Sequence, residues 1–281
     1  MEREVLKSMF DNLLHIGNKV NFWNPRMKPY IYGATNGIHV INLVKTAEKI
    51  EEVKARLNEV TKSGKKVLFV ATRLQAKDAF QKLAIDTGNF YVSEKWVPGL
   101  LTNFKTIRRR IGTYLKLLKD QELGEFETLT KKEKASRLLE LDKLSKAYGG
   151  LKEMKKLPEL IFVVDGVYES QAIKEANSLN IECISILNSN GDDIVVSNCI
   201  PANTNSPKSL LFIANSLKSS IVVGAVPTTQ DRTNEGVKVK KIEDKKISGE
   251  KKSFKKPETK TEEVKTEPKA KKATKTEEVE A

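Results

Sequence analysis

The chain has 281 residues, of which 39% are hydrophobic and 31% are charged, and 50 basic side chains against 37 acidic ones give a net charge of +13. Residues 231–281 hold 16 of the basic and 12 of the acidic side chains, so the preceding residues carry a net charge of +9. No apolar run approaches the roughly 20 residues of a membrane span, and Cys183 and Cys199 are too few and too far apart for a disulfide framework or a CxxC motif.

The net charge of residues 1–230 indicates what kind of partner the protein binds. A net of +9 over residues 1–230 favours a polyanionic partner, with nucleic acid ahead of an anionic membrane surface. The N-terminal stretch MEREVLKSMFDNLLHIG is amphipathic and has no signal-peptide core, and so few cysteines suit a reducing compartment. We therefore expect a soluble cytoplasmic protein with no membrane partner.

The first unusual segment is NFWNPRMKPYIYG, residues 21–33, which holds four aromatic side chains, two prolines and two cations. The aromatic positions follow neither the helical nor the strand period. Pro25 and Pro29 lack an N–H group and keep the residue before each of them away from helical angles. We therefore expect an irregular loop just before the first strand.

The first half of the chain alternates strand patterns with helix patterns. The apolar runs 38–43, 66–72 and 90–92 are strand-like, and the second is continuous enough for a strand buried on both faces. Helices are expected between these runs over 46–62 and 74–86, each followed closely by a glycine.

The second half repeats this alternation after a long interruption. The runs 159–166 and 181–187 predict two more buried strands around a helix at 169–179. The segment DIVVSN, 193–198, is a candidate edge strand, and the last helix begins at Ser206-Pro207, a capping serine before proline. The alternation predicts an α/β fold with a mostly parallel sheet and helices on both faces.

The interruption has no strand pattern. Apolar residues recur at helical spacing over 107–118 and again over 138–148, and Thr130 with Glu133 fits a capping box. We expect an antiparallel, coiled-coil-like helical hairpin over 105–149 that projects from the sheet domain. The alternative is that both helices lie against the sheet.

This hairpin divides a globular domain made of residues 1–104 and 150–227. Residues 228–281 are mostly Lys, Glu, Thr, Pro and Ala, with almost no large apolar side chain. Because such a segment cannot bury enough surface to offset the entropy of ordering, we expect a disordered tail.

The segment YVSEKWVPGLLTNFKTIRRRIG, residues 91–112, joins the second tryptophan to a dense group of cations. Three consecutive arginines spread over a wide arc of a helix, which favours a phosphate backbone over a single acidic helix. The alternative is a solvated basic face above an inward-facing apolar stripe. We expect Trp96 to anchor the loop in the core. The predicted nucleic-acid ligands are Lys95, Lys105, Arg108, Arg109 and Arg110.

An enzyme is the main alternative, because sheets of this kind often bind nucleotides. Neither Gly-x-Gly-x-x-Gly after the first strand nor Gly-x4-Gly-Lys-Ser/Thr occurs in the sequence. Asp165 ends a predicted strand and Asp192 follows the next one, where such sheets place catalytic carboxylates. No nucleophile–base pair accompanies either residue.

A metal site is also a poor interpretation of the sequence. The fold would have to gather His15, His39 and two distant cysteines. Buried thiols and hydrogen-bonded histidines are the simpler expectation. We therefore expect no cofactor, no bound metal and no small-molecule substrate.

Several stretches resemble the bacterial small-subunit ribosomal proteins of the S-two family. The likeness covers residues 5–224 in family order and stops before the C-terminal segment. The stretches that carry it are NFWNPRMKPYIYGATNGIHVINLVKT (21–46), YVSEKWVPGLLTNFKTI (91–107), LTKKE (129–133), YGGLKEMKKLPELIFVVD (148–165) and AIKEANSLNI (172–181).

The resemblance implies a flavodoxin-like parallel sheet with a helical hairpin inserted after the third strand. It implies a structural constituent of the small ribosomal subunit that binds ribosomal RNA at the head–body junction. Neighbouring small-subunit proteins, including the large mRNA-binding one, are implied as partners. No enzymatic activity is implied.

The resemblance also implies that residues 21–33 bind RNA. Prolines stiffen the segment, so little conformational entropy is lost on binding RNA. Its cations are suited to phosphates and its asparagines to sugar or base edges, while some of its aromatics pin the loop to the domain. The predicted RNA ligands here are Asn21, Trp23, Asn24, Arg26 and Lys28.

The chain departs from the family pattern at two places. Residues 15–18 read His-Ile-Gly-Asn where His-Phe-Gly-His is frequent, and residues 187–193 read Leu-Asn-Ser-Asn-Gly-Asp-Asp where Val-Asp-Thr-Asn-x-Asp-Pro is common. Any ion or polar contact that depends on those groups is therefore not implied here. A soluble RNA-binding regulator outside the ribosome is the third alternative.

Overall fold

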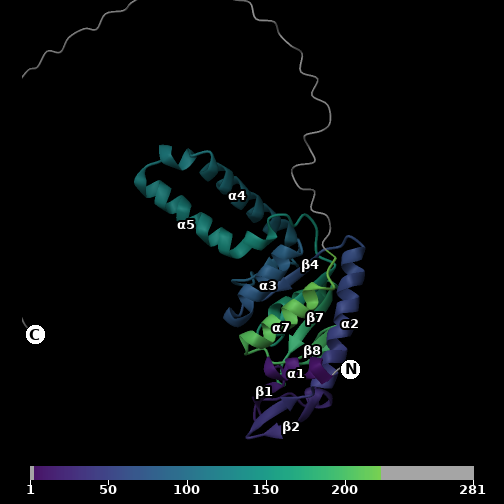
Figure 1. Ribbon diagram of the computed structural model, residues 1–281. Helices are drawn as coiled ribbons and strands as arrows, with labels where there is room; N and C mark the ends of the chain where they lie inside the picture. The colour runs from purple at the N-terminus through teal and green to yellow at the C-terminus, as the bar shows by residue number, and fades with distance from the viewer. Residues whose placement is uncertain (1–2, 223–281) are drawn as a thin grey trace, which may run out of the picture. The chain divides into compact units, whose positions relative to one another are not determined.

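Uninterrupted runs of Val, Leu, Ile and Phe form the central sheet of the computed structural model, which describes residues 3–222. Five parallel strands are hydrogen-bonded in the order β5–β4–β6–β7–β8 (Figure 1). Every residue of β4 and β6 is buried, because helices cover both faces of the sheet. The strand bounds are β4 Val67–Val70, β5 Phe90–Val92, β6 Leu160–Val164, β7 Glu182–Leu187 and β8 Asn198–Pro201.

Two apolar layers cover the sheet. Phe69 and Phe162 point into a layer with α1, α2, α3 and α7, while their neighbours Leu68 and Ile161 point into a layer with α6 and the first half of α4. This arrangement confirms the predicted flavodoxin-like α/β fold. The helix bounds are α1 Arg3–Asp11, α2 Leu43–Lys62, α3 Leu74–Asp86, α4 Phe104–Glu122, α5 Lys131–Tyr148, α6 Ser170–Ser178 and α7 Pro207–Lys218.

The strand expected over 38–43 does not belong to the parallel sheet. β3 (Ile38–Ile41) lies in a separate antiparallel sheet, between β1 (Ile16–Lys19) and β2 (Ile31–Thr35). Asn36 and Gly37 both have positive φ, 52° and 75°, and form a two-residue hairpin turn. Because so short a turn makes its strands antiparallel, the Asn-Gly pair already argued against a parallel strand here.

Residues 21–33 are more regular than predicted. Pro25–Tyr30 forms a short 3-10 helix, η1, and the side-chain oxygen of Asn24 caps it by accepting the N–H of Arg26 at 3.1 Å. Met27 is buried in the core and pins the segment to the domain. The prediction of an irregular loop is therefore correct only up to Asn24.

The edge strand begins later than the predicted 193–198. The side chain of Asp192 accepts the N–H of Ile194 at 3.2 Å and starts a 3-10 turn, η4 (Asp193–Val195), in place of a strand. The strand β8 follows at Asn198.

Two predicted helix caps have different outcomes. The capping box of α5 is confirmed, because the Glu133 carboxylate accepts the N–H of Thr130 at 3.2 Å and the Thr130 hydroxyl accepts the N–H of Glu133. Ser206 stands at the cap position of α7, with Pro207 first in the helix, but its side chain makes no capping hydrogen bond.

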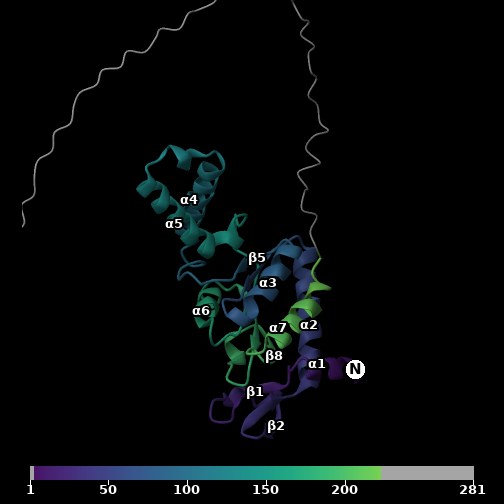
Figure 2. The same ribbon diagram turned by 60° about the vertical axis from the view of Figure 1, so that its left-hand side comes forward.

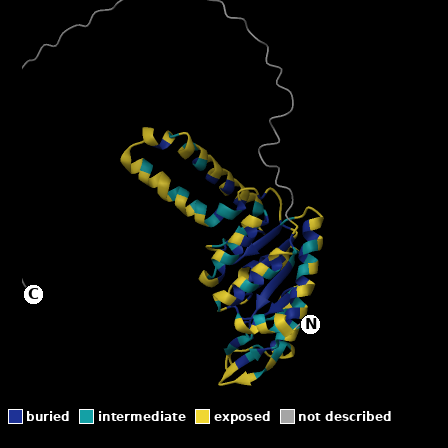
Figure 3. Cartoon of the chain, viewed as in Figure 1, coloured by how far each residue is buried: buried dark blue, intermediate teal, exposed yellow. Residues whose placement is uncertain are grey.

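The segment between β5 and β6 forms a hairpin of α4 and α5 that extends beyond the sheet (Figures 1 and 2). Buried side chains of α4 run from Ile107 to Leu117, whereas α5 buries only Tyr148, at its C-terminal end. Figure 3 shows most of the surface of both helices as exposed. The alternative, in which both helices lie against the sheet, is wrong.

The division into domains stays a prediction, and the tail expected over 228–281 lies outside the described residues. Across residues 3–222, none of the helices has both the length and the apolar content needed to cross a membrane.

Gly150, in the turn η3 (Gly149–Leu151) that ends the hairpin, lies against β5. A Cβ atom at Gly150 would overlap the carbonyl oxygen and ring of Tyr91, whereas one at Gly149 would meet nothing within 4 Å. We expect Gly150→Ala to lower the free energy of unfolding by about 1–3 kcal/mol, the usual cost of overpacking. Gly149→Ala should not lower it. Equal midpoints for the two variants in chemical denaturation would contradict this packing.

Candidate nucleic-acid interface

One buried carboxylate holds the loop between β5 and α4. Glu175, on α6, is 4% exposed and accepts the Nε1–H of Trp96 at 3.0 Å, the N–H of Gly99 at 2.8 Å and the N–H of Leu101 at 3.1 Å. Gly99 has a φ of 85°, which side chains rarely permit. Trp96 is therefore confirmed as a core anchor, and the direction in which α4 begins is fixed.

The hydrogen bonds also keep Glu175 charged. Burial acts to raise the pKa of this carboxyl, but the hydrogen bonds from Trp96 and the backbone N–H groups outweigh burial and hold the pKa below its ordinary value. Glu175 was not among the predicted functional residues. The available signal was a glutamate on the apolar face of a helix, between Ile173 and Ala176.

Beyond this loop, the first two turns of α4 present cations to solvent. Ile107 and Ile111 face the core, and the basic side chains lie around the rest of the helix. Within residues 3–222, none of these cations forms an ion pair with an acidic side chain. The exposed cations of α4 are Lys105, Arg108, Arg109 and Arg110, and Lys95 is exposed in the loop that precedes the helix.

This placement of charge is unfavourable for the helix alone. A helix N-terminus carries a partial positive charge, so cations in the first turns are repelled by it and by one another. The first turn of α4 has no acidic residue, and Asn103 makes no side-chain capping bond. A bound polyanion would relieve this repulsion.

Arg26, in the N-terminal segment, already has an anionic partner. Its Nη1 donates to the two carboxylate oxygens of Asp192 at 2.8 and 2.7 Å, and half of its side chain is exposed. The hydrogen bond from Arg26 lowers the pKa of Asp192 below its ordinary value. Because a phosphate would have to displace this carboxylate, the ion pair counts against the prediction that Arg26 binds RNA.

The other predicted ligands of this segment differ in exposure and in the contacts that they make within the protein. Lys28 and Asn21 are exposed, and Lys28 has no acidic partner within the described residues. The side-chain oxygen of Asn24 caps η1, and its amide nitrogen takes no part in that bond. Trp23 lies 5.2 Å from the ring of His39 and is 37% exposed, so most of its indole packs against the protein.

The predicted ligands form two separate surfaces. Figures 1 and 2 both place α4 at the opposite end of residues 3–222 from β2. We call the cations Lys95, Lys105, Arg108, Arg109 and Arg110 the hairpin-root surface. We call Asn21, Trp23, Asn24, Arg26 and Lys28 the N-terminal surface.

The strand-end carboxylates serve the fold. Asp165 forms an ion pair with Arg73 at 2.5 Å and accepts the hydroxyl of Thr204 at 3.2 Å. Glu169, whose pKa is raised by burial, accepts the N–H of Thr72 at 3.1 Å. Both carboxylates lie near the ends of β4 and β6, where related sheets bind ligands, and both are engaged in internal polar contacts.

The histidines and cysteines are packed side chains. His15 stacks on Phe10 at 4.2 Å, and His39 lies against Trp23. Within residues 3–222 the Nδ1 of His15 and both ring nitrogens of His39 have no hydrogen-bond partner, so the expectation of hydrogen-bonded histidines is wrong. Burial lowers the pKa of His15 and raises the pKa of Cys183 to about 12. In this part of the chain no three or more metal-binding side chains cluster.

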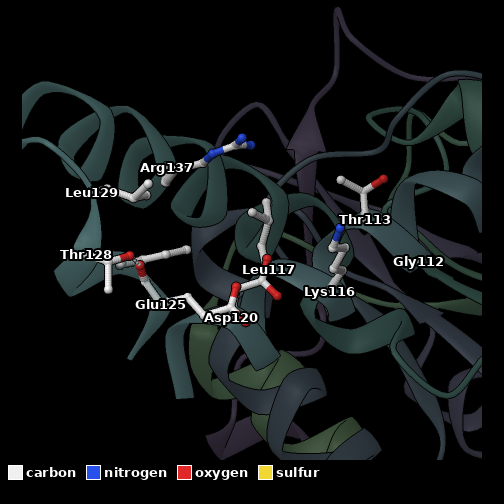
Figure 4. A pocket seen from close by; sticks show the side chains of 10 residues that line it. Gly112, Thr113, Lys116, Leu117, Asp120, Glu125, Thr128, Leu129 and Arg137 are labelled. Atoms are coloured by element: carbon white, nitrogen blue, oxygen red, sulfur yellow. Dashed lines mark hydrogen bonds between the residues drawn. The ribbon is translucent and has the colours of Figure 1, made fainter. Parts of the chain in front are cut away.

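A hollow of about 700 Å³ lies within the hairpin, between α4, η2 (Glu125–Thr128) and α5. Figure 4 shows Lys116 and Arg137 on its walls together with Asp120 and Glu125. Neither strand-end carboxylate lines it. The hollow therefore does not supply the ligand site that the enzyme interpretation requires.

Known proteins with similar sequences identify the family to which this chain belongs. The family described as Ribosomal protein S2 matches residues 9–224. The chain belongs to that family. The small ribosomal subunit protein uS2 of Coprothermobacter proteolyticus is 39% identical over 219 residues, covering 78% of this chain and 82% of the relative. The protein of the same name from Tolumonas auensis is 40% identical over 222 residues, covering 79% of this chain and 91% of the relative.

Membership of the S2 family makes the protein a structural ribosomal protein and not an enzyme. The matched region includes all the residues of both candidate surfaces. It ends at residue 224, before the segment for which a tail was predicted.

The Glu175 contacts predict a pH-dependent stability. We expect Glu175→Gln to lower the free energy of unfolding by about 1–3 kcal/mol at pH 7, because the amide leaves buried donors unsatisfied. Since the folded-state pKa of Glu175 is depressed, its stabilisation is present above the unfolded-state pKa and is lost as pH falls through the folded-state pKa. The difference between the two proteins should therefore shrink in acid.

Denaturation at a series of pH values measures this difference. The exposed Glu153→Gln is the matched control and should have little effect at any pH. A deficit for Glu175→Gln that stayed constant from pH 7 into the acid range would count against a charged Glu175.

Proposed function

We propose that this protein is a structural constituent of the small ribosomal subunit that binds ribosomal RNA through phosphate and shape contacts and thereby supports translation. The observation that carries the proposal is the set of exposed cations at the hairpin-root surface without acidic partners among residues 3–222. Phosphates are the ligands that such an arc of lysine and arginine fits best.

The rigidity of the root supports recognition of folded RNA. Glu175 and Trp96 fix the start of α4 to the sheet domain, so the cations are presented at set positions. Folded RNA is recognised largely by its shape and its phosphate positions. A prearranged surface loses little entropy when it binds such a target.

The N-terminal surface adds a second, smaller contact. Lys28 is its exposed cation without an acidic partner in the described part of the chain, and η1 holds it in place. We place the protein in the cytoplasm as part of the ribosome, beside neighbouring small-subunit proteins that include the large mRNA-binding one. The printed names of the relatives, small ribosomal subunit protein uS2, support this placement.

The alternative is an RNA-binding regulator that acts away from the ribosome. Sedimentation of the native protein from lysate separates the two functions. The proposal requires the protein to migrate with small subunits, whereas a regulator would bind RNA and remain in lighter fractions.

Removal of the hairpin-root cations tests the proposal directly. We expect alanine at Lys105, Arg108, Arg109 and Arg110 to weaken binding to a small-subunit RNA transcript and to flatten the dependence of log K on log salt by about one unit per lost contact. Thermal stability should stay within about 0.5 kcal/mol because the side chains are exposed.

The matched control removes four cations that already have acidic partners. Alanine at Lys49, Lys54, Lys134 and Lys146 removes the same charge from the protein. If the salt dependence flattened equally in both variants, the loss of net charge alone would explain the weaker binding. That result would overturn the assignment of this surface.

The ion pair of Arg26 gives a prediction for the N-terminal surface. Lys28→Ala should reduce incorporation into subunits more than Arg26→Ala, because Arg26 is already engaged by Asp192. Quantitative comparison of the two variants in reconstituted subunits measures this order. Normal incorporation of Lys28→Ala would contradict an RNA role for this segment.

Trp23→Ala should lower the melting temperature of the free protein, since the Trp23 ring packs on His39.

A further inference from the structure

A groove at the amino-terminal edge of the parallel sheet is lined by residues that belong to neither candidate surface. It encloses about 600 Å³ between the turn that follows α2, the start of β5 and the segment that leads into β6. Phe90 and Leu157 provide its apolar lining, and Leu157 is 41% exposed. Four lysines and two glutamates complete the charged lining, namely Lys65, Lys66, Lys155, Lys156, Glu153 and Glu159.

Two of the four lysines already bond to other groups of the protein, and two do not. Lys65 forms an ion pair with Glu159 at 2.6 Å, and the Nζ of Lys66 donates to the carbonyl oxygen of Gly88 at 2.6 Å. Lys155 and Lys156 are exposed, and within residues 3–222 neither has an acidic partner. The fold thus fixes two of the cations on one side of the groove and leaves two on the other to meet a ligand.

The groove adjoins the hairpin root. Leu151 and Met154, in the segment that carries the lysines, pack in the same apolar cluster as Ile107 and Ile111 of α4. Between them the Nζ of Lys152 lies 5.4 Å from the ring centre of Tyr114, also on α4. The segment that carries Lys155 and Lys156 therefore contacts α4 through Lys152.

We infer that this amino-edge groove and the hairpin-root surface form one continuous phosphate-binding band for an RNA backbone, with Lys155 and Lys156 as its added ligands. The inference rests on the proposed function, since it names a second part of the same RNA surface. A mononucleotide would engage only one end of the band, whereas an extended polyanion engages both. The apolar lining accepts the face of a sugar or an unstacked base.

The test uses the full chain and a transcript of small-subunit ribosomal RNA. Lys155→Ala with Lys156→Ala should flatten the log K against log salt dependence by about two units, while the same positions changed to arginine should keep the slope. Alanine at Lys49 and Lys54, which have acidic partners, is the matched control. Melting temperatures verify that each variant is folded.

The outcomes distinguish this inference from the proposed function. An unchanged slope for the Lys155/Lys156 variant, with a flattened slope for the hairpin-root variant, overturns the band and keeps the proposed function. Unchanged slopes for both variants overturn the two together. Normal RNA affinity with lost incorporation into subunits would make the groove a protein-docking site and also overturn the inference.

Discussion

The buried carboxylate of Glu175 is the interaction on which the functional part of the structure depends. It gathers the indole of Trp96 and two backbone N–H groups at the point where the chain leaves the sheet and enters α4. A charged group buried in this way is stable only because its hydrogen bonds compensate for the lost water. The same bonds hold the cations of α4 at fixed positions, so a contact that stabilises the fold also presents the surface.

The two edges of the parallel sheet have opposite chemistry. At the carboxyl edge, Asp165 with Arg73 and Asp192 with Arg26 neutralise one another, and the antiparallel sheet packs nearby. At the amino edge and the hairpin root, lysines and arginines have few acidic partners. In this fold class the carboxyl edge often serves catalysis, whereas here its carboxylates are engaged in ion pairs. Apart from Lys28, the exposed cations of the two candidate surfaces without acidic partners among residues 3–222 belong to the hairpin-root surface. This distribution suits a protein that binds a large polyanion.

Much of the fold could be predicted because hydrophobic period and helix signals are local. The continuous apolar run at 66–72 and the capping box at Thr130 placed β4 and the start of α5 correctly. The antiparallel sheet was missed because β1 and β2 are short and half-exposed, and their pairing depends on a turn at Asn36-Gly37. Strands of four or five residues carry too little pattern to be recognised without their partners.

For the interface, the order of residues is enough to show which side chains carry charge and that the cations of α4 lie off its apolar face. Which of these charges are already neutralised depends on contacts that form only when the chain folds. Arg26 and Lys28 look equivalent in the sequence, yet only Arg26 meets a carboxylate, from a residue far along the chain. Glu175 gains its role in the same way, through Trp96, which lies 79 positions away along the chain. Ion pairs and buried hydrogen bonds act over a few ångströms of space, and that distance is set by folding and not by order along the chain.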